Sequence, residues 1–277
     1  MSSVIGIGSL GGSGTRAVAQ VLMDAGIYMG DDLNHANDNL IFTRLFKNPG
    51  WYRNANKRSV EARLRVFEEY MQNDRISLKN AATLIGASAN NPTMKSHREL
   101  AWNMLGKIGK SGGNRDRWGW KEPNTQIFIE DLSNYFPSFK YIHVVRHGLD
   151  MAFSKNRQQL NNWGPRYDIH LNGNESKEEI AFKQLEYWIR SNKDVASKGE
   201  RLGSDFLLLN HTTFCSHPRQ QVDRIISFLG IELPMDRLAK LYELPRDTGS
   251  NDRYSKFDIG IFDDRQIDYV RQLGFEV

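Results

Sequence analysis

Short apolar runs and longer amphipathic stretches alternate along the chain, and this alternation predicts an α/β fold. Four runs have the length and the apolar or β-branched character of buried strands, at residues 4–8, 118–120, 140–145 and 206–209. Apolar positions recur at helical spacing in the stretches between and after them, at residues 15–25, 126–135, 148–158, 178–201 and 218–229. Strands that alternate with helices favour a mostly parallel central sheet with helices on both faces, which is a three-layer α/β/α arrangement.

Two segments depart from this alternation. Residues of about 40–115 hold several helical patterns separated by polar turns, which predicts a helical insertion on one side of the sheet. Residues of about 156–177 are polar and rich in asparagine, with Trp163 and Tyr167 among them, and predict a long loop that serves as a lid. The chain shows no internal repeat and no change of composition that would mark a linker, so we expect one domain over residues 1–277.

Composition and charge indicate a globular protein without a strong electrostatic field. Apolar residues make up 39% and charged residues 25% of the 277 residues, which is ordinary for a folded domain. The 37 basic and 33 acidic residues leave a formal charge of +4, so attraction of anions must come from local clusters. This balance fits a phosphate-rich ligand, and we expect no nucleic-acid partner.

Cysteine and histidine usage gives no sign of a metal site or a disulfide. Cys215 is the single cysteine, and the seven histidines show neither HxxxH nor HExxH spacing. The N-terminus lacks the basic and apolar regions of a signal peptide, and nowhere do about 18 apolar residues follow one another. We therefore expect a cytoplasmic protein without a metal ion and without a membrane partner.

The glycine-rich turn after the first strand is the first candidate for chemistry. Gly11, Gly12, Ser13 and Gly14 would let backbone N–H groups approach an anion, and the helix that starts near Thr15 would direct its positive end toward it. This favours a phosphate cradle, with a ligand-free strand-to-helix turn as the alternative. The nucleotide triphosphatase form is disfavoured because its motif requires a lysine where Gly14 precedes Thr15.

A second candidate follows the strand at residues 140–145. Arg146 ends this strand, and the helical pattern after it would place Ser154 two turns further on. A guanidinium group at a strand end offers a planar fork to phosphate, and a serine hydroxyl can add a donor. The two side chains therefore form a candidate site for one phosphate group, unless they are a surface arginine and a solvated helix serine.

Together, these two segments resemble the sulfotransferase family. Residues 9–16, which include Arg16, resemble the family's 5′-phosphosulfate loop, and Arg146 with Ser154 reproduces the arginine and serine of its 3′-phosphate motif. The resemblance implies a P-loop-like fold, with 3′-phosphoadenosine 5′-phosphosulfate (PAPS) as the sulfuryl donor and 3′-phosphoadenosine 5′-phosphate (PAP) as the product. It also implies in-line transfer, without a metal, to a hydroxyl or amine of a small-molecule or glycan acceptor beside the helical insertion.

One departure from the family concerns the cradle. Many members carry lysine or arginine where Gly12 stands, and that cation contacts the sulfate and the departing phosphate. Lys121, which follows the Trp-Gly-Trp strand, is the candidate substitute because the resemblance places the corresponding lysine of the tyrosylprotein branch at the transferring group. Arg16 is the second candidate, and an ordinary surface lysine is the alternative interpretation of Lys121.

Two further roles follow from the resemblance. The family keeps its general base about fifteen to twenty residues after the cradle threonine, and that window makes Asp32 and His35 the candidates here. A solvated turn at residues 30–32 is the alternative. Near the C-terminus, Arg246 and especially Arg253 are candidates to close over the 3′-phosphate.

Two other classes of function stay open at this point. A P-loop-type kinase or nucleotide hydrolase would explain the cradle, but the missing cradle lysine and the pair of Arg146 and Ser154 argue against it. A catalytically inactive nucleotide-binding relative would explain Gly12. Formation of a sulfated product separates the enzyme from the inactive relative.

Overall fold

Four parallel strands form the centre of the computed structural model, which describes residues 3–91, 98–108, 112–246 and 252–277. The strands are β1 (Ser3–Ser9), β2 (Arg117–Lys121), β3 (Phe139–Val145) and β4 (Phe206–Asn210), in the order β2-β1-β3-β4. All four runs predicted as strands are therefore strands. In the β1–β2 register Ile7 lies opposite Lys121, so the carboxyl ends of these two strands are neighbours.

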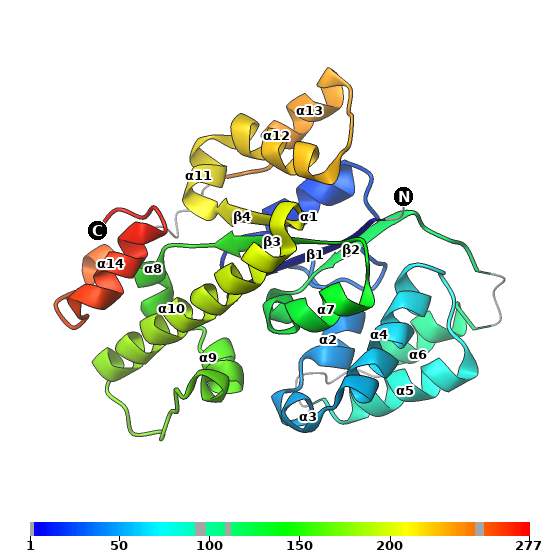
Figure 1. Ribbon diagram of the computed structural model, residues 1–277, viewed down its shortest axis with the longest axis horizontal. Helices are drawn as coiled ribbons and strands as arrows, with labels where there is room; N and C mark the ends of the chain where they lie inside the picture. Colours follow the sequence, from blue (N-terminus) through cyan, green and yellow to red (C-terminus); the bar gives the residue numbers. More distant parts are fainter. Residues whose placement is uncertain (1–2, 92–97, 109–111, 247–251) are drawn as a thin grey trace.

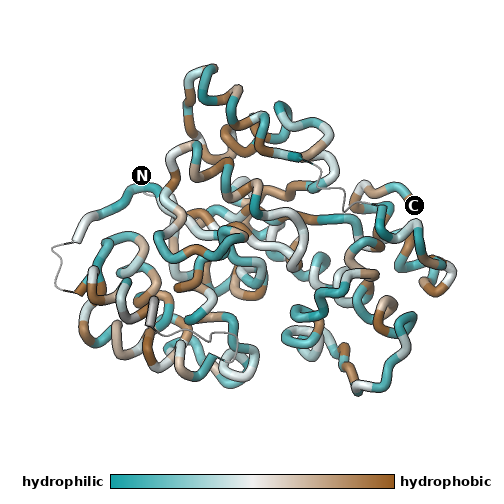
Figure 2. The backbone as a smooth tube through the Cα atoms, turned by 180° about the vertical axis from the view of Figure 1, so that it is seen from behind, coloured by the Kyte–Doolittle hydropathy of each residue, from teal (hydrophilic) through white to brown (hydrophobic). Residues whose placement is uncertain are grey.

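Side chains of the strands alternate between two apolar cores, one on each face of the sheet. Ile5 and Ile7 of β1 belong to one core, and Val4 belongs to the other. Tyr141 of β3 lies on the same face as Val4. A Cβ atom at Gly8 of β1 would lie 2.4 Å from the Tyr141 hydroxyl, so the two strands leave no room for a side chain there. Both faces of β1 and β3 are thus buried, which explains their near-continuous apolar sequences, whereas Leu208 of the edge strand β4 is exposed. Figure 2 shows such apolar stretches running through the centre of the molecule.

Helices cover both faces of the sheet (Figure 1). One face carries α1 (Thr15–Asp24), α11 (His211–Ser216), α12 (Pro218–Leu229) and α13 (Met235–Tyr242). The other face carries α7 (Ile129–Tyr135) and α10 (Lys177–Leu202), with α8 (Gly148–Ala152) and α14 (Asp264–Gln272) packed against α10. The predicted three-layer α/β/α arrangement is confirmed.

In the described part of the helical insertion predicted at about 40–115, the structure has five helices. They are α2 (Leu40–Phe46), α3 (Pro49–Asn54), α4 (Lys57–Met71), α5 (Leu78–Ala89) and α6 (Arg98–Leu105). Asn39, Asn48 and Asn56 cap the first three, because each side-chain oxygen accepts a backbone N–H three residues further on. The ring of Phe42 stacks on that of Trp120, with centroids 5.4 Å apart, and so joins α2 to the sheet.

The prediction of a helix over 148–158 was wrong beyond Ala152, where α8 ends. The Gln184 side chain of α10 donates to the carbonyl oxygens of Ala152 and Ser154, so it satisfies the end of the helix in place of a further turn. The Ser154 hydroxyl then accepts the backbone N–H of Asn156 at 3.2 Å, a local turn that redirects the chain.

The prediction of a loop over 156–177 was also wrong for its first part. Residues Gln158–Trp163 form α9, and a 3₁₀ turn follows at Gly164–Tyr167. Trp163 is buried, and its indole N–H donates to the side-chain oxygen of Asn124 at 2.8 Å, which fixes α9 against the 3₁₀ turn Pro123–Phe128. From residue 168 to Ser176 the chain has no regular structure.

Across the described residues, no helix combines the length and the apolar character that crossing a bilayer requires.

Candidate active site

The turn between β1 and α1 has the shape of an anion cradle. Gly12 and Gly14 take positive φ values of 91° and 80°, a backbone conformation that glycine adopts at little cost. A Cβ atom at Gly14 would lie 2.1 Å from the His211 ring, so this position also requires glycine for space. The hydroxyl of Ser13 donates to the Leu10 carbonyl at 2.6 Å and closes the turn. The N-cap residue of α1 is Gly14, which makes no side-chain cap, so the positive end of the helix suits an anionic ligand.

A cavity of about 230 Å³ adjoins this turn, and its walls come from five separate segments of the chain. The turn supplies Gly11, Gly12, Gly14, Thr15 and Arg16; the segment before α2 supplies Ala36 and Asp38; the end of α2 supplies Lys47; the end of β2 supplies Lys121 to Asn124; and the region of α9 supplies Asn156, Gln158 and Gln159. Three cations and two carboxylates therefore surround one space at the carboxyl ends of β1 and β2. In parallel α/β sheets this edge is where ligands bind.

Lys121 is brought to the cradle by the pairing of β2 with β1. Its side chain is buried, at 3% exposure for the residue, and its ammonium group donates to the Ala36 carbonyl at 3.0 Å and to the carboxylate of Asp38. The other oxygen of Asp38 accepts the side-chain N–H of Asn34 at 2.9 Å. Lys121 is thus a strand-end lysine held in an ion pair, and the alternative of an ordinary surface lysine does not describe it.

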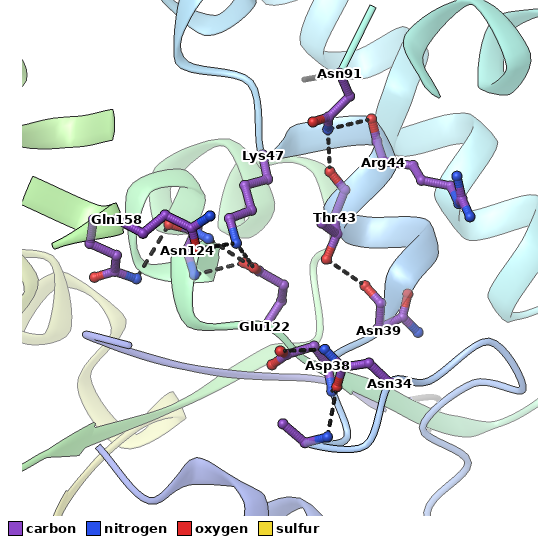
Figure 3. A network of polar contacts seen from close by, with 12 residues as sticks. Asn34, Asp38, Asn39, Thr43, Arg44, Lys47, Asn91, Glu122, Asn124 and Gln158 are labelled. Atoms are coloured by element: carbon purple, nitrogen blue, oxygen red, sulfur yellow. Dashed lines mark hydrogen bonds and ion pairs between the residues drawn. The ribbon is translucent and has the colours of Figure 1, made fainter. Parts of the chain in front are cut away.

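A second lysine and a buried carboxylate lie beside this pair (Figure 3). Glu122 is 1% exposed and accepts the backbone N–H of Asn124 at 2.7 Å and its side-chain N–H at 2.8 Å. Burial raises the pKa of the Glu122 carboxyl above its ordinary value, and the charge of Lys47 partly opposes this. The Lys47 ammonium group lies 3.9 Å from Glu122 Oε1 and donates to Gln158 Oε1 at 3.0 Å.

Arg146 reaches the cradle from the end of β3. Its guanidinium Nη1 donates to the carbonyl oxygen of Gly12 at 2.9 Å, and its own carbonyl accepts the indole N–H of Trp188 at 3.1 Å. Ser154 lies just beyond α8 rather than on it, next to Asn156, which lines the cavity. The structure thus brings Arg146 into contact with the cradle. Ser154 itself does not line the cavity but contacts Asn156, which does.

The predicted base candidates, Asp32 and His35, lie in the segment before α2 but are not among the residues that line the cavity. Asp32 is buried, and its carbonyl accepts the Leu40 N–H at 2.8 Å, whereas His35 is exposed. Asp38, three residues after His35, lines the cavity instead. Its sequence signal is only its position two residues before the helical pattern at Leu40, close to a helix start, and this position does not mark a cavity residue.

The loop that carries the C-terminal arginines, Arg246 and Arg253, is only partly within the described residues. Arg253 Nη1 donates to the Asp150 carbonyl of α8 at 3.2 Å, in the helix that follows Arg146. Arg246 is exposed, and residues 247–251 of the predicted closing loop lie outside the described residues. Arg16, on the first turn of α1, is exposed and lines the cavity.

Two other observations bear on the chemistry of this edge. His143 is buried between Tyr141 and Asn192, and burial lowers the pKa of its imidazole to about 4, so it is a neutral packing residue of β3. In the described parts of the chain, no group of three or more His, Cys, Asp or Glu side chains is placed to hold a metal ion.

A larger cavity of about 640 Å³ lies between α3, α4, α7 and α9. Tyr52, Trp163 and Arg166 are among its lining residues, and the Tyr52 hydroxyl donates to Asp131 at 2.8 Å. Helix α9 borders both cavities, with Gln158 and Gln159 toward the cradle and Trp163 toward the larger one.

Comparison with known proteins identifies the family. The model of a family described as the sulfotransferase family matches residues 5–235, and no curated protein matches the chain. Among solved structures, the sulfotransferase domain of the Synechococcus PCC 7002 olefin synthase superposes with a TM-score of 0.54 at 14% identity, covering 100% of this chain and 96% of that one. The sulfotransferase domain from the curacin biosynthetic pathway gives 0.53 at 14% identity, covering 100% and 99%. These solved structures share the P-loop-like fold expected from the sequence. Because the family model matches residues 5–235, which is most of this chain, the chain belongs to the sulfotransferase family.

Proposed function

We propose that this protein transfers the sulfuryl group of PAPS to a hydroxyl or amine of a small-molecule or glycan acceptor. The observation that carries the proposal is the meeting of three groups at one edge of the sheet: the cradle of Gly11 to Thr15, Arg146 in contact with Gly12, and Lys121 in the adjoining cavity. A bare, left-handed backbone at Gly14 and an uncapped helix start suit the 5′-phosphosulfate, and a guanidinium group beside them suits the 3′-phosphate.

In-line transfer needs a base for the acceptor proton and cations for the charge on the departing phosphate. We assign the base to Asp38 in preference to Asp32 and His35, because Asp38 alone of the three lines the cavity that Lys121 enters. The acceptor oxygen would attack sulfur as the bond from sulfur to the 5′-phosphate oxygen breaks, while its proton passes to the Asp38 carboxylate. Lys121, paired with Asp38, would stabilise the negative charge that develops on the leaving oxygen.

The acceptor is expected to approach along α9, since that helix joins the cradle cavity to the larger cavity. Tyr52 and Trp163 give the larger cavity aromatic walls, and Asp131 and Arg166 give it polar ones. Walls of this kind suit an acceptor that carries a ring and polar substituents, such as a sugar or an aromatic compound.

A catalytically inactive relative is the second candidate, and Gly12 is the observation that favours it. With a φ of 91°, this position does not readily accept the cationic side chain that many family members carry there. A nucleotide that raises the melting temperature without any release of sulfate or formation of a sulfated product would support this candidate.

Calorimetric titration with PAP and AMP tests the proposed donor site. PAP should bind at least about tenfold more tightly than AMP, because only PAP carries the phosphate that Arg146 and Ser154 are proposed to contact. Arg146→Ala should remove most of this preference. Ser154→Ala should reduce it while leaving the contact between Arg146 and Gly12 in place. Equal affinities of the native protein for both nucleotides would contradict the assignment.

A further inference from the structure

At the Gly12 position the cradle has no cationic side chain, and Lys47 approaches the adjoining cavity from outside the turn, as Lys121 does. Gly12 has no side chain, and its positive φ disfavours one. Lys47 directly follows α2 and lines the same cavity as Gly11, Gly12 and Gly14. Because α2 and the cradle are far apart in the sequence, no local motif marks this approach.

The backbone from which Lys47 extends is held at both ends of α2. Asn39 caps the start of the helix by accepting the Phe42 N–H at 2.9 Å. The Asn91 side chain donates to the Thr43 carbonyl at 2.8 Å, in the last turn before Lys47. Asn48, the next residue, caps α3 by accepting the Trp51 N–H at 2.9 Å. The lysine therefore extends from a fixed point at the junction of α2 and α3.

Two polar groups hold the far end of the side chain (Figure 3). Gln158 of α9 accepts a hydrogen bond from the ammonium group at 3.0 Å, and Glu122 Oε1 lies 3.9 Å from it. The Lys47 side chain is only 16% exposed, so its charge acts in a partly desolvated space where electrostatic attraction is stronger than in water.

Lys47 and Lys121 differ in how closely a carboxylate pairs with the ammonium group. The Lys121 ammonium group is in direct contact with the Asp38 carboxylate, whereas the separation of Lys47 from Glu122 is that of a loose ion pair. An ammonium group has three N–H donors, and a neutral amide takes one of those of Lys47 at Gln158. Lys47 can therefore turn a donor toward an anionic ligand without breaking a close ion pair.

We propose that Lys47 supplies the cation that Gly12 lacks, by contacting the sulfuryl group of the bound donor, and that Glu122 and Gln158 position it. This inference rests on the proposed function and adds a residue to it. Lys47 would be a catalytic residue, because it would touch the transferring group. Glu122 and Gln158 would act only through Lys47.

Nucleotide binding by Lys47→Met tests the proposal, since methionine keeps the apolar stem and removes the charge. PAP, which lacks the sulfuryl group, should bind within about twofold of its native affinity, whereas PAPS should bind about tenfold more weakly. Release of sulfate from PAPS to water, a readout that needs no acceptor, should slow by about 10²-fold. Lys47→Arg should retain part of both properties, and Gln158→Ala should weaken PAPS selectively but less than Lys47→Met.

Two controls keep the test decisive. Lys79→Met, at an exposed lysine of α5 that lines neither cavity, should leave the affinities for both nucleotides unchanged. If Lys47→Met unfolds because Glu122 loses its cation, the double variant with Glu122→Gln should restore folding but not the affinity for PAPS.

The possible results distinguish a failure of the proposed role of Lys47 from a failure of the proposed sulfotransferase function. A folded Lys47→Met protein with native PAPS affinity and native sulfate release would overturn the role of Lys47 and leave the proposed function intact. Equal weakening of PAP and PAPS would also overturn it, because it would show a contact with the phosphates rather than with the sulfuryl group. A native protein that binds neither nucleotide would contradict the proposed function itself.

Discussion

At the scale of single residues, Lys121 shows how the pairing of two strands places a lysine at the wall of a cavity. Burial at a strand end removes most of its contact with water, and the ion pair with Asp38 compensates for the lost hydration. The ion pair orients both charges toward the cradle cavity. Lys121 and Asp38 therefore form one unit, in which removal of either partner affects the other.

We expect Lys121→Ala to slow sulfate release from PAPS by about 10²–10³-fold, because a preorganised cation would be lost at the leaving oxygen. PAP affinity should change far less, since its phosphates are proposed to bind the cradle and Arg146. Turnover and calorimetric affinity, measured on the same preparation, give the comparison. Near-native turnover in a folded variant would refute the role and direct attention to Arg16, whereas a lowered melting temperature alone would indicate a structural lysine.

The residues of the candidate site fall into two groups, those marked by a local sequence motif and those brought to the cavity by packing of distant segments. The cradle and Arg146 were predictable because each is local, a glycine-rich turn after a strand and an arginine at a strand end. Asp38, Lys47 and Gln158 were not identified, because they reach the cavity only after α2 and α9 pack beside the sheet. The general base and the phosphate contacts stay predictions until a ligand is bound.

At the scale of elements, the turn between β1 and α1 depends on a neighbour from the other end of the chain. His211, the first residue of α11, packs against Gly14 so closely that a methyl group there would meet its ring. Gly12 has the same backbone handedness but open space around it. Substitution of Gly12 therefore tests backbone strain alone, whereas substitution of Gly14 tests backbone strain together with a clash with the His211 ring.

Gly12→Ala should cost about 1–2 kcal/mol of unfolding free energy, the typical penalty for a left-handed backbone at alanine. Gly14→Ala should cost clearly more, because its methyl group also displaces the His211 ring. Urea unfolding measures both values. Adding His211→Ala to Gly14→Ala should recover part of the loss, and the absence of any recovery would show that the clash with the ring is not the cause.

The strands and most helices were predictable, but the end of α8 and the short helix α9 were not. The periodic pattern after Arg146 continues past Ala152, whereas the helix stops there because Gln184 of α10 takes over its carbonyl groups. In the same way, the polar composition of residues 158–163 gave no sign of a helix, and the buried contact of Trp163 with Asn124 stabilises one. Tertiary contacts decided both cases, and no window of local sequence contains them.

At the scale of the whole molecule, aromatic rings of α2 and α4 join the helical insertion to β2 of the sheet. Phe42 stacks on Trp120 of β2 and also contacts Phe46, Phe67 and Phe128. These residues belong to one core cluster, which extends from the helical insertion to the strands. One domain was expected from chain length and composition, and we propose on the ground of this shared core that the chain unfolds as one unit.

Phe42→Ala should cost about 3–5 kcal/mol of unfolding free energy, because it opens a cavity where the helical insertion meets the sheet. Helical circular dichroism and tryptophan fluorescence should follow the same urea transition, shifted to lower urea, as expected for one cooperative unit. Phe42→Leu, which refills most of the space, should cost much less. Loss of helical signal at a urea concentration that leaves the fluorescence transition unchanged would show two units that fold separately.

The pairing of β1 has a consequence for the order of folding during synthesis. This strand ends at Ser9, yet its partners begin at Arg117 and Phe139, so the first of the four strands to be made waits more than a hundred residues for its neighbours. At ~5–20 residues per second, the ribosome needs on the order of ten seconds to reach β3 after it has made β1. During this interval the apolar strand and the cradle behind it have no sheet to join. The nascent chain must therefore shield β1 by transient collapse or by a chaperone, and nucleotide can assist folding only after β3 has emerged.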